Sequence, residues 1–168
     1  MEVSFVGSFS NRYADRTDVL EAVARVAPLR TWTADPTLLP EDSAIRPTIQ
    51  GAAWGRAMFE VLARSQITIN THGRIAGDAA NNLRLFEGTG MGALLLTDAR
   101  SNLGDLFEVG HEVVTYRHAQ ECAEVVRHYM AHRGEAEHIA AAGQQRTLRD
   151  HTWRDRAERL VDLVQRRI

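Results

Sequence analysis

The chain has 168 residues, of which 44% are hydrophobic and 25% charged, and its net charge is −2 at pH 7. This suits one globular domain, and the near-neutral charge offers no general attraction to nucleic acid or to an anionic membrane. All 20 basic residues are arginine and there is one cysteine, so a lysine Schiff base, an internal disulfide and a thiolate metal cluster are excluded.

Predicted strands and helices alternate along the chain. Short apolar or β-rich runs predict strands at Val3–Val6, Leu29–Thr33, Ile67–Asn70, Ala93–Leu96 and Val113–Tyr116. Apolar residues at helical spacing predict helices at Thr17–Val26, Ala52–Arg64 and Asn81–Thr89, and from Ala119 to the end. This alternation predicts a doubly wound α/β domain over residues 1–168, with a parallel sheet covered by helices on both faces.

Two of the helical segments carry further expectations. In Ala52–Arg64 an apolar stripe is expected to include Trp54 and Met58. The C-terminal helices are expected to break near Gly134 and again at 149–152, where Asp150 or Thr152 would cap a last helix from Trp153. The apolar side chains of that last helix are expected to pack on their own domain or on a second copy; they are Leu160, Val161 and Val164.

The loop after the first strand is a candidate anion site. Gly7 and Ser8 end the strand, and a glycine there lets backbone N–H groups approach an anion closely. Arg12 and Arg16 follow, and an arginine at a helix start is a bidentate phosphate donor. The alternative is a simple turn with arginines exposed to solvent.

Residues 70–87 form a second candidate site, at a strand-to-helix junction rich in polar groups. Asn70 and His72 follow the strand, a helix start near Asn81 would present free N–H groups to a phosphate, and Glu87 could accept two hydrogen bonds from a vicinal diol. The alternatives are an asparagine that only caps the helix, a loop histidine with no ligand, and a solvated glutamate.

The ends of several predicted strands carry polar groups that should converge. Gly7–Ser8, 70–72 and Thr97–Asp98 each follow a strand, and ligands of open α/β sheets bind beyond the carboxyl ends of the strands. The G-x-G-x-x-G motif of an ordinary NAD site is missing. The histidines at helical spacing lack a completing carboxylate or cysteine pattern, so a solvated helix, no metal and no cofactor are expected; they are His128, His132 and His138.

Several segments resemble a known family. VSFVGS, ITINTHG, NNLRLFEGTGMGALLLTD, LFEVGHEVVTY and IAAAGQQRTLRDHTWRDR are similar, in this order, to the C-terminal domain of CgeB-like spore-maturation glycosyltransferases. The resemblance covers Val3 to about Leu160 and is most specific over Asn81–Asp98. It implies a GT-B architecture, in which two Rossmann-like halves face a cleft and this half binds the nucleotide-sugar donor. The N-terminal acceptor half is absent from this chain.

The resemblance also implies roles for individual residues. Glu87 matches the acidic residue that binds the ribose hydroxyls, and Arg16, with Arg12 as a neighbour, matches a position suited to the diphosphate. The remaining donor-binding candidates are the strand-end pair Gly7 and Ser8, the Asn-x-His pair Asn70 and His72, and the helix-start residues Asn82, Leu83 and Arg84. Ala79 stands where many retaining GT-B enzymes have the first of two glutamates, and the usual phosphate lysine is missing. Both departures weaken the expected contacts to the sugar and to its phosphates.

We therefore expect a cytoplasmic glycosyltransferase half that binds a nucleotide diphosphate sugar for transfer to an unknown acceptor. It is expected to be inactive without an N-terminal GT-B half or a partner chain, and no nucleic-acid partner or membrane span is expected. The alternatives are a non-catalytic nucleotide or nucleotide-sugar binding module and, less favoured, an interaction domain that has lost the ligand.

Overall fold

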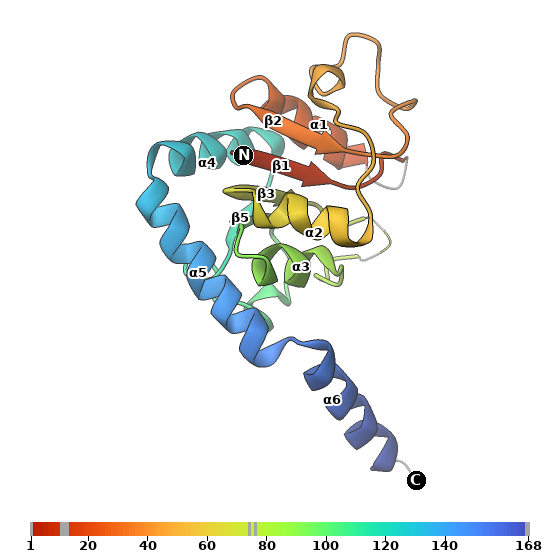
Figure 1. The fold of residues 1–168 in the computed structure, drawn as a ribbon, viewed down its shortest axis with the longest axis vertical. Helices are drawn as coiled ribbons and strands as arrows, with labels where there is room; N and C mark the ends of the chain where they lie inside the picture. Colours follow the sequence, from red (N-terminus) through yellow and green to blue (C-terminus); the bar gives the residue numbers. More distant parts are fainter. Residues whose placement is uncertain (1, 11–13, 74, 76, 167–168) are drawn as a thin grey trace.

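A five-stranded parallel sheet forms the centre of the protein in its computed structural model, which describes residues 2–10, 14–73, 75 and 77–166 (Figure 1). Its order is β2-β1-β3-β4-β5. The strands are β1 (Val3–Val6), β2 (Leu29–Trp32), β3 (Ile67–Asn70), β4 (Leu94–Asp98) and β5 (Val114–Tyr116). The sequence prediction of a parallel α/β sheet is confirmed, and each strand starts within one residue of the predicted position.

The helices cover both faces of the sheet. On one face α1 (Ala14–Ala24) packs against α4 (Ala119–Ala131), and on the other α2 (Gly55–Ala63) contacts α3 (Arg84–Gly90) (Figure 1). The chain moves outward from β1 to β2 and then crosses back past β1 to reach β3, so β1 and β3 are neighbours from which the chain leaves in opposite directions. Such a switch point leaves a crevice at the carboxyl ends of the strands, where ligands of this fold class bind.

The C-terminal third consists of three helices, of which the first two pack on the body of the domain and the last does not. α5 (Arg133–Asp150) contacts α3 and β4, and α6 (Trp153–Gln165) projects away from the body of the molecule (Figure 1). Two short 3-10 turns complete the fold, η2 (Arg46–Thr48) and η4 (Leu103–Asp105). Within the described part of the chain, no helix is both long enough and apolar enough to cross a lipid bilayer.

Three predicted helix starts are wrong. The helix predicted from Thr17 already includes Ala14. The predicted helix from Asn81 begins at Arg84, because the Asn82 amide bonds back to Asn70 and Thr71 and does not cap a helix. The predicted helix from Ala52 begins at Gly55. Trp54 has extended backbone at the N-cap, and with 73% of its surface exposed it is no part of the apolar stripe.

The predicted C-terminal break is confirmed, and Thr152 rather than Asp150 caps α6. Thr152 and Asp155 form a reciprocal capping box, in which each side chain accepts from the other residue's backbone N–H. The earlier break lies at His132, and Gly134 is inside α5. Packing of the α6 stripe on its own domain is wrong, because α6 runs away from the sheet and Leu160, Val161 and Val164 remain about half exposed or more.

Candidate functional site

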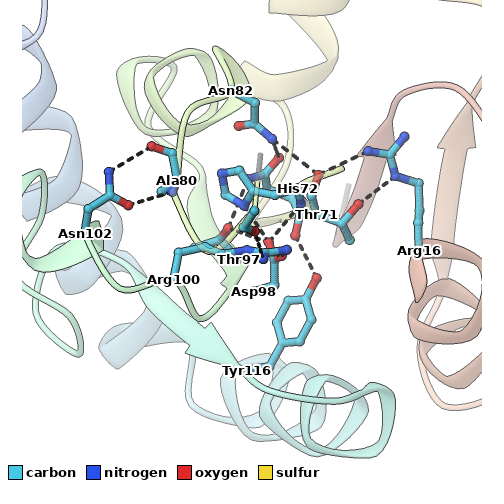
Figure 2. A network of polar contacts seen from close by, with 12 residues as sticks. Arg16, Thr71, His72, Ala80, Asn82, Thr97, Asp98, Arg100, Asn102 and Tyr116 are labelled. Atoms are coloured by element: carbon cyan, nitrogen blue, oxygen red, sulfur yellow. Dashed lines mark hydrogen bonds and ion pairs between the residues drawn. The ribbon is translucent and has the colours of Figure 1, made fainter. Parts of the chain in front are cut away.

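The candidate site residues converge at the carboxyl ends of β1, β3 and β4, as the sequence predicts. Arg12 lies outside the described residues. Hydrogen bonds join the loop after β3 to Arg16 and to Asn82 (Figure 2). Arg16 also bonds to Ser8 in the loop after β1, and Arg84 in the first turn of α3 bonds to Val6 at the end of β1. Segments far apart in the sequence are therefore tied together at the switch point.

Arg16 links the two strand-end loops of this network. Its Nη1 donates to the Ser8 carbonyl at 2.5 Å, its Nε to the Thr71 hydroxyl at 2.6 Å and its Nη2 to the Thr71 carbonyl at 3.1 Å. The side chain also lies over the Phe5 ring, and only 8% of the residue is exposed. Since these bonds join the loop after β1 to the loop after β3, Arg16 sets the width of the crevice.

Gly7 is needed here for space rather than for a free N–H group. Its own N–H donates to the Trp32 carbonyl at 3.0 Å and so does not point toward a ligand, whereas the lack of a side chain is required by the fold. A Cβ at this position would lie 2.7 Å from the Phe5 ring, closer than packing allows.

The loop after β3 is held by amide side chains. Asn70 Nδ2 donates to the Thr97 hydroxyl at 2.9 Å, and the Asn70 carbonyl accepts from Tyr116 Oη at 2.7 Å (Figure 2). Asn82 Nδ2 donates to Asn70 Oδ1 at 2.9 Å and to the Thr71 carbonyl at 3.3 Å. Burial raises the pKa of Tyr116 well above its usual value, so its hydroxyl remains a donor.

His72 and Asp98 form a buried dyad beside this loop. Asp98 Oδ1 accepts from His72 N–H at 3.0 Å and lies 2.7 Å from His72 Nδ1, and Arg100 donates twice to Asp98 Oδ2. Burial alone raises the pKa of Asp98, but the hydrogen bonds from His72 and Arg100 and the electrostatic attraction of these two groups outweigh it, so the pKa lies below its usual value. Asp98 is therefore a carboxylate at neutral pH.

The loop before α3 is fastened to the segment after β4. Arg100 Nη1 donates to the Gly77 carbonyl at 2.7 Å, and Ser101 donates through both its N–H and its hydroxyl to the Asp78 carbonyl at 3.0 Å. The Asn102 amide both accepts from Ala80 N–H, at 2.6 Å, and donates to the Ala80 carbonyl, at 3.2 Å. These bonds hold the approach to α3 in one conformation.

Glu87 and Arg84 form an ion pair in the first turn of α3. Arg84 Nη1 lies 2.7 Å from Glu87 Oε2 and 2.9 Å from Met58 Sδ, while Nη2 donates to the Val6 carbonyl at 3.3 Å. Burial lowers the pKa of Arg84, and the Glu87 charge partly offsets this. Arg84 thus connects Glu87 with the end of β1, next to the Gly7–Ser8 loop.

Two cavities flank this ion pair. One, of about 110 Å³, lies at the ends of β1 and β2 and is lined by Gly7, Trp32, Trp54 and Arg84 among others. The other, of about 310 Å³, lies between α3 and α6 and is lined by Glu87 with mostly apolar neighbours such as Trp153. Arg84 therefore faces the first cavity and Glu87 the second.

A third cavity, of about 380 Å³, opens on the α1 and α4 side of the carboxyl edge. It is lined by the dyad and by charged residues that include Arg16, Arg100 and Arg117. His128, His132 and His138 lie far from this edge on α4 and α5. His128 Nε2 contacts Glu135 Oε2 at 2.9 Å, and among the described residues no group of three or more His, Cys, Asp or Glu is arranged to hold a metal ion.

Several residues of the site were not found from the sequence. Arg100, Asn102 and Tyr116 act through contacts with residues 22 to 46 positions away, for which a single sequence gives no signal. The sequence held a weak indication for Trp54, since it directly precedes a glycine, Gly55, that has φ +50 and begins α2. Trp54 lies at the edge of a cavity rather than in the core.

Most of the chain matches one known protein family. The profile of the glycosyl transferase-like family matches residues 13–162. The chain belongs to this family. The search of curated proteins found no match.

Solved structures of low sequence identity share this fold. HepE from Anabaena, in complex with UDP and glucose, matches with a TM-score of 0.76 at 11% sequence identity. Sucrose-phosphate synthase from Thermosynechococcus elongatus matches with a TM-score of 0.73 at 15% sequence identity. The match covers 98% of this chain in both cases, but only 48% and 45% of those proteins. The C-terminal domain of a glycosyl transferase group 1 protein from Francisella tularensis also matches, with a TM-score of 0.66 at 10% identity. This match spans 90% of the present chain and 86% of that domain. The fold is that of the C-terminal half of a GT-B glycosyltransferase.

Proposed function

We propose that this chain is the donor-binding half of a glycosyltransferase of the CgeB-like kind, and that it binds a nucleoside diphosphate sugar at the carboxyl edge of its sheet. The observation that carries the proposal is the Arg84–Glu87 ion pair, which a hydrogen bond joins to the end of β1 at the switch point. HepE, which shares the fold, has been solved with UDP-glucose and with UDP. The acceptor would bind to groups outside this chain.

In this proposal Glu87 accepts hydrogen bonds from the ribose hydroxyls. Arg84 contacts Glu87 through Oε2, and Oε1 has no hydrogen bond among the described residues. A carboxylate beside an anionic nucleotide would repel it unless a donor on the nucleotide compensates. The ribose diol supplies two such donors, whereas the phosphates supply none at neutral pH.

The diphosphate would lie between the strand-end loops that Arg16 connects. The positively charged guanidinium of Arg16 lies within this crevice, where it bonds to Ser8 on one side and to Thr71 on the other. Arg84 adds a second cation near the end of β1. Preorganised cations of this kind stabilise the charge that develops on a departing diphosphate, which favours transfer chemistry without a protein nucleophile.

The nucleobase would occupy the cavity at the ends of β1 and β2. Trp54 borders this cavity with 73% of its surface exposed, and Trp32 and Met58 line its wall. Stacking of a base on an aromatic ring is worth roughly 1–3 kcal/mol, and the exposed indole of Trp54, at the start of α2, is suited to it. Trp153 is equally exposed but borders the other cavity, between α3 and α6.

Calorimetry with UDP, GDP, ADP and dTDP tests this proposal. At least one of these diphosphates is expected to bind, and Trp54→Ala should weaken it about fivefold to a hundredfold. Trp153→Ala is the comparison variant and should have the smaller effect, because Trp153 borders only the cavity that Glu87 faces. Absence of binding for all four would contradict the proposed function, and an effect of Trp153→Ala alone would move the base to the other cavity.

A non-catalytic binding module remains the alternative, because Ala79 stands at a position where a carboxylate was expected to contact the sugar. Both readings predict binding of the diphosphate. Transfer or hydrolysis of a bound nucleotide sugar, measured with the longest natural chain that contains this domain, separates them.

A further inference from the structure

Two buried polar atoms at the carboxyl edge have no hydrogen-bond partner among the described residues. They are His72 Nε2 and Asn82 Oδ1. The His72 side chain has no exposed surface at all. Since nearly all buried polar atoms in proteins are satisfied, two such atoms on adjoining loops indicate that something outside the chain completes them.

The bonds of Asp98 make His72 Nε2 an acceptor. Asp98 is a carboxylate and can only accept, so the hydrogen between it and the imidazole lies on His72 Nδ1. In the neutral ring Nε2 then carries a lone pair and no hydrogen. Arg100 supports this arrangement, because its two bonds to the other carboxylate oxygen keep Asp98 oriented and charged.

The bonds of Asn82 make its free atom an acceptor as well. Its amide nitrogen lies within hydrogen-bond distance of Asn70 Oδ1 and of the Thr71 carbonyl. Asn70 Oδ1 is itself fixed as an oxygen, because the Asn70 amide nitrogen donates to Thr97. A flipped Asn82 would place its oxygen against two acceptors, so the atom left without a partner is the oxygen.

The two acceptors belong to adjoining segments of the carboxyl edge. Asn82 Nδ2 is 3.3 Å from the Thr71 carbonyl, whose carbon is bonded directly to the His72 nitrogen, and Figure 2 shows both side chains beside this peptide. Asn82 is partly exposed and stands between the exposed residues Asn81 and Leu83. The Asn102 amide holds Ala80, two residues before Asn82, through two hydrogen bonds.

We propose that His72 Nε2 and Asn82 Oδ1 bind hydroxyl groups of the donor's sugar and thereby contribute to the choice of sugar. The proposal rests on the function proposed above and assigns a ligand to a part of that site. Two acceptors match two O–H donors, as on neighbouring carbons of a sugar ring, and they disfavour the oxygens of a phosphate, which are acceptors themselves. Asp98 and Arg100 are positioning residues for His72.

The test compares two matched ligand pairs, UDP with UDP-glucose and GDP with GDP-mannose, by calorimetry on the whole chain. The readout is the ratio of the dissociation constant of the diphosphate to that of its sugar form. His72→Phe keeps a ring but removes the acceptor, and Asn82→Leu keeps the approximate volume. His138→Phe and Asn81→Leu are matched controls at exposed positions.

His72→Phe and Asn82→Leu should each lower this ratio about two- to tenfold, the value of one neutral hydrogen bond, while the controls leave it unchanged. The diphosphate affinity should stay near that of the wild type, which also shows that each variant is folded. A ratio that neither variant changes would overturn the proposal, because the free atoms would then bind only an ordered water. Failure of every diphosphate to bind the wild type would instead contradict the proposed function.

A second measurement needs no variant. Single-deoxy analogues of the preferred nucleotide sugar, each lacking one ring hydroxyl, are titrated into the wild-type protein. Two of them should bind about two- to tenfold more weakly than the parent, and His72→Phe should remove the penalty for one of the two. Equal affinity for all analogues would overturn the proposal.

Discussion

The carboxyl edge of the sheet and the projecting helix α6 differ in what they bury. At the edge, charged and polar side chains such as Arg16 and His72 are 8% and 6% exposed, whereas α6 leaves Leu160 63% exposed and buries no residue. Buried polar and exposed apolar side chains are the informative exceptions to ordinary burial. The edge therefore buries polar side chains that need partners, whereas α6 leaves apolar side chains uncovered.

At the edge, each polar group is fixed by partners from other loops. Arg16 bonds to a residue 55 positions away, and Ala80 bonds to one 22 positions away. In α6, by contrast, the structural support is local and consists of the Thr152–Asp155 capping box. The edge should thus unfold with the whole domain, while α6 should gain or lose helix on its own.

The largest expected effect is that of Asp98→Ala. This change leaves Arg100 and His72 without their shared acceptor in a mostly buried site, and it should lower the free energy of unfolding by about 2–4 kcal/mol. Denaturant titration followed by circular dichroism measures it. Asp78→Ala is the control, since Asp78 is exposed and contributes only its backbone carbonyl to the network. Equal effects of the two substitutions would remove the basis for calling the edge a network.

The acid dependence of Asp98 is a smaller effect with a definite sign. Because the folded pKa lies below the unfolded value of about 3.9, the carboxylate stabilises the fold fully above pH 4–5, and this contribution is lost as pH falls through the folded pKa. The stability difference between wild type and Asp98→Asn should therefore be constant near neutral pH and shrink in acid. A difference that grows as the pH falls would show that the assigned sign is wrong.

The smallest expected effect belongs to α6. Thr152→Ala removes half of the capping box and should cost the helix about 1 kcal/mol, seen as a modest loss of helical signal. Diphosphate affinity and the unfolding midpoint of the sheet should stay the same if the two regions are independent. A matched loss of affinity would show that α6 supports the site through the cavity it shares with Glu87.

The sequence predicted those features that local patterns determine. Apolar runs such as Leu94–Leu96 located the strands, and Thr152 before Trp153 located a helix start, because burial and capping each leave a signal within a few residues. The convergence of strand ends followed from the parallel topology. The burial of the Arg16 side chain could not be predicted in this way, since its bonds to Thr71 depend on the order of the strands in space.

Asn82 and Trp54 show the same limit at helix starts. An asparagine before a helix is usually its cap, but here a neighbouring strand end competes for the amide and α3 starts at Arg84. Trp54 fitted an apolar stripe by spacing, yet it lies outside the helix and faces a cavity. In both cases tertiary contacts override a local preference, and both lie at the proposed binding site.

The self-association of α6 remains a prediction of the sequence. Its exposed apolar residues are suited to a second copy, and sedimentation equilibrium over a wide concentration range measures this directly. Leu160→Glu should weaken any dimer, whereas a wild type that stays monomeric at high concentration would contradict the expectation.

The most direct test of the central claim is the pairing of Glu87 with the ribose. Glu87→Ala should weaken the bound diphosphate about tenfold to several hundredfold, as expected for two hydrogen bonds to a charged acceptor, and should have little effect on the 2′,3′-dideoxy analogue. Glu60→Ala removes a similar glutamate, which pairs with Arg56 on α2, and should change neither affinity. If Glu87→Ala weakens the normal and the dideoxy ligand equally, Glu87 does not bind the ribose and the proposed orientation of the nucleotide is wrong.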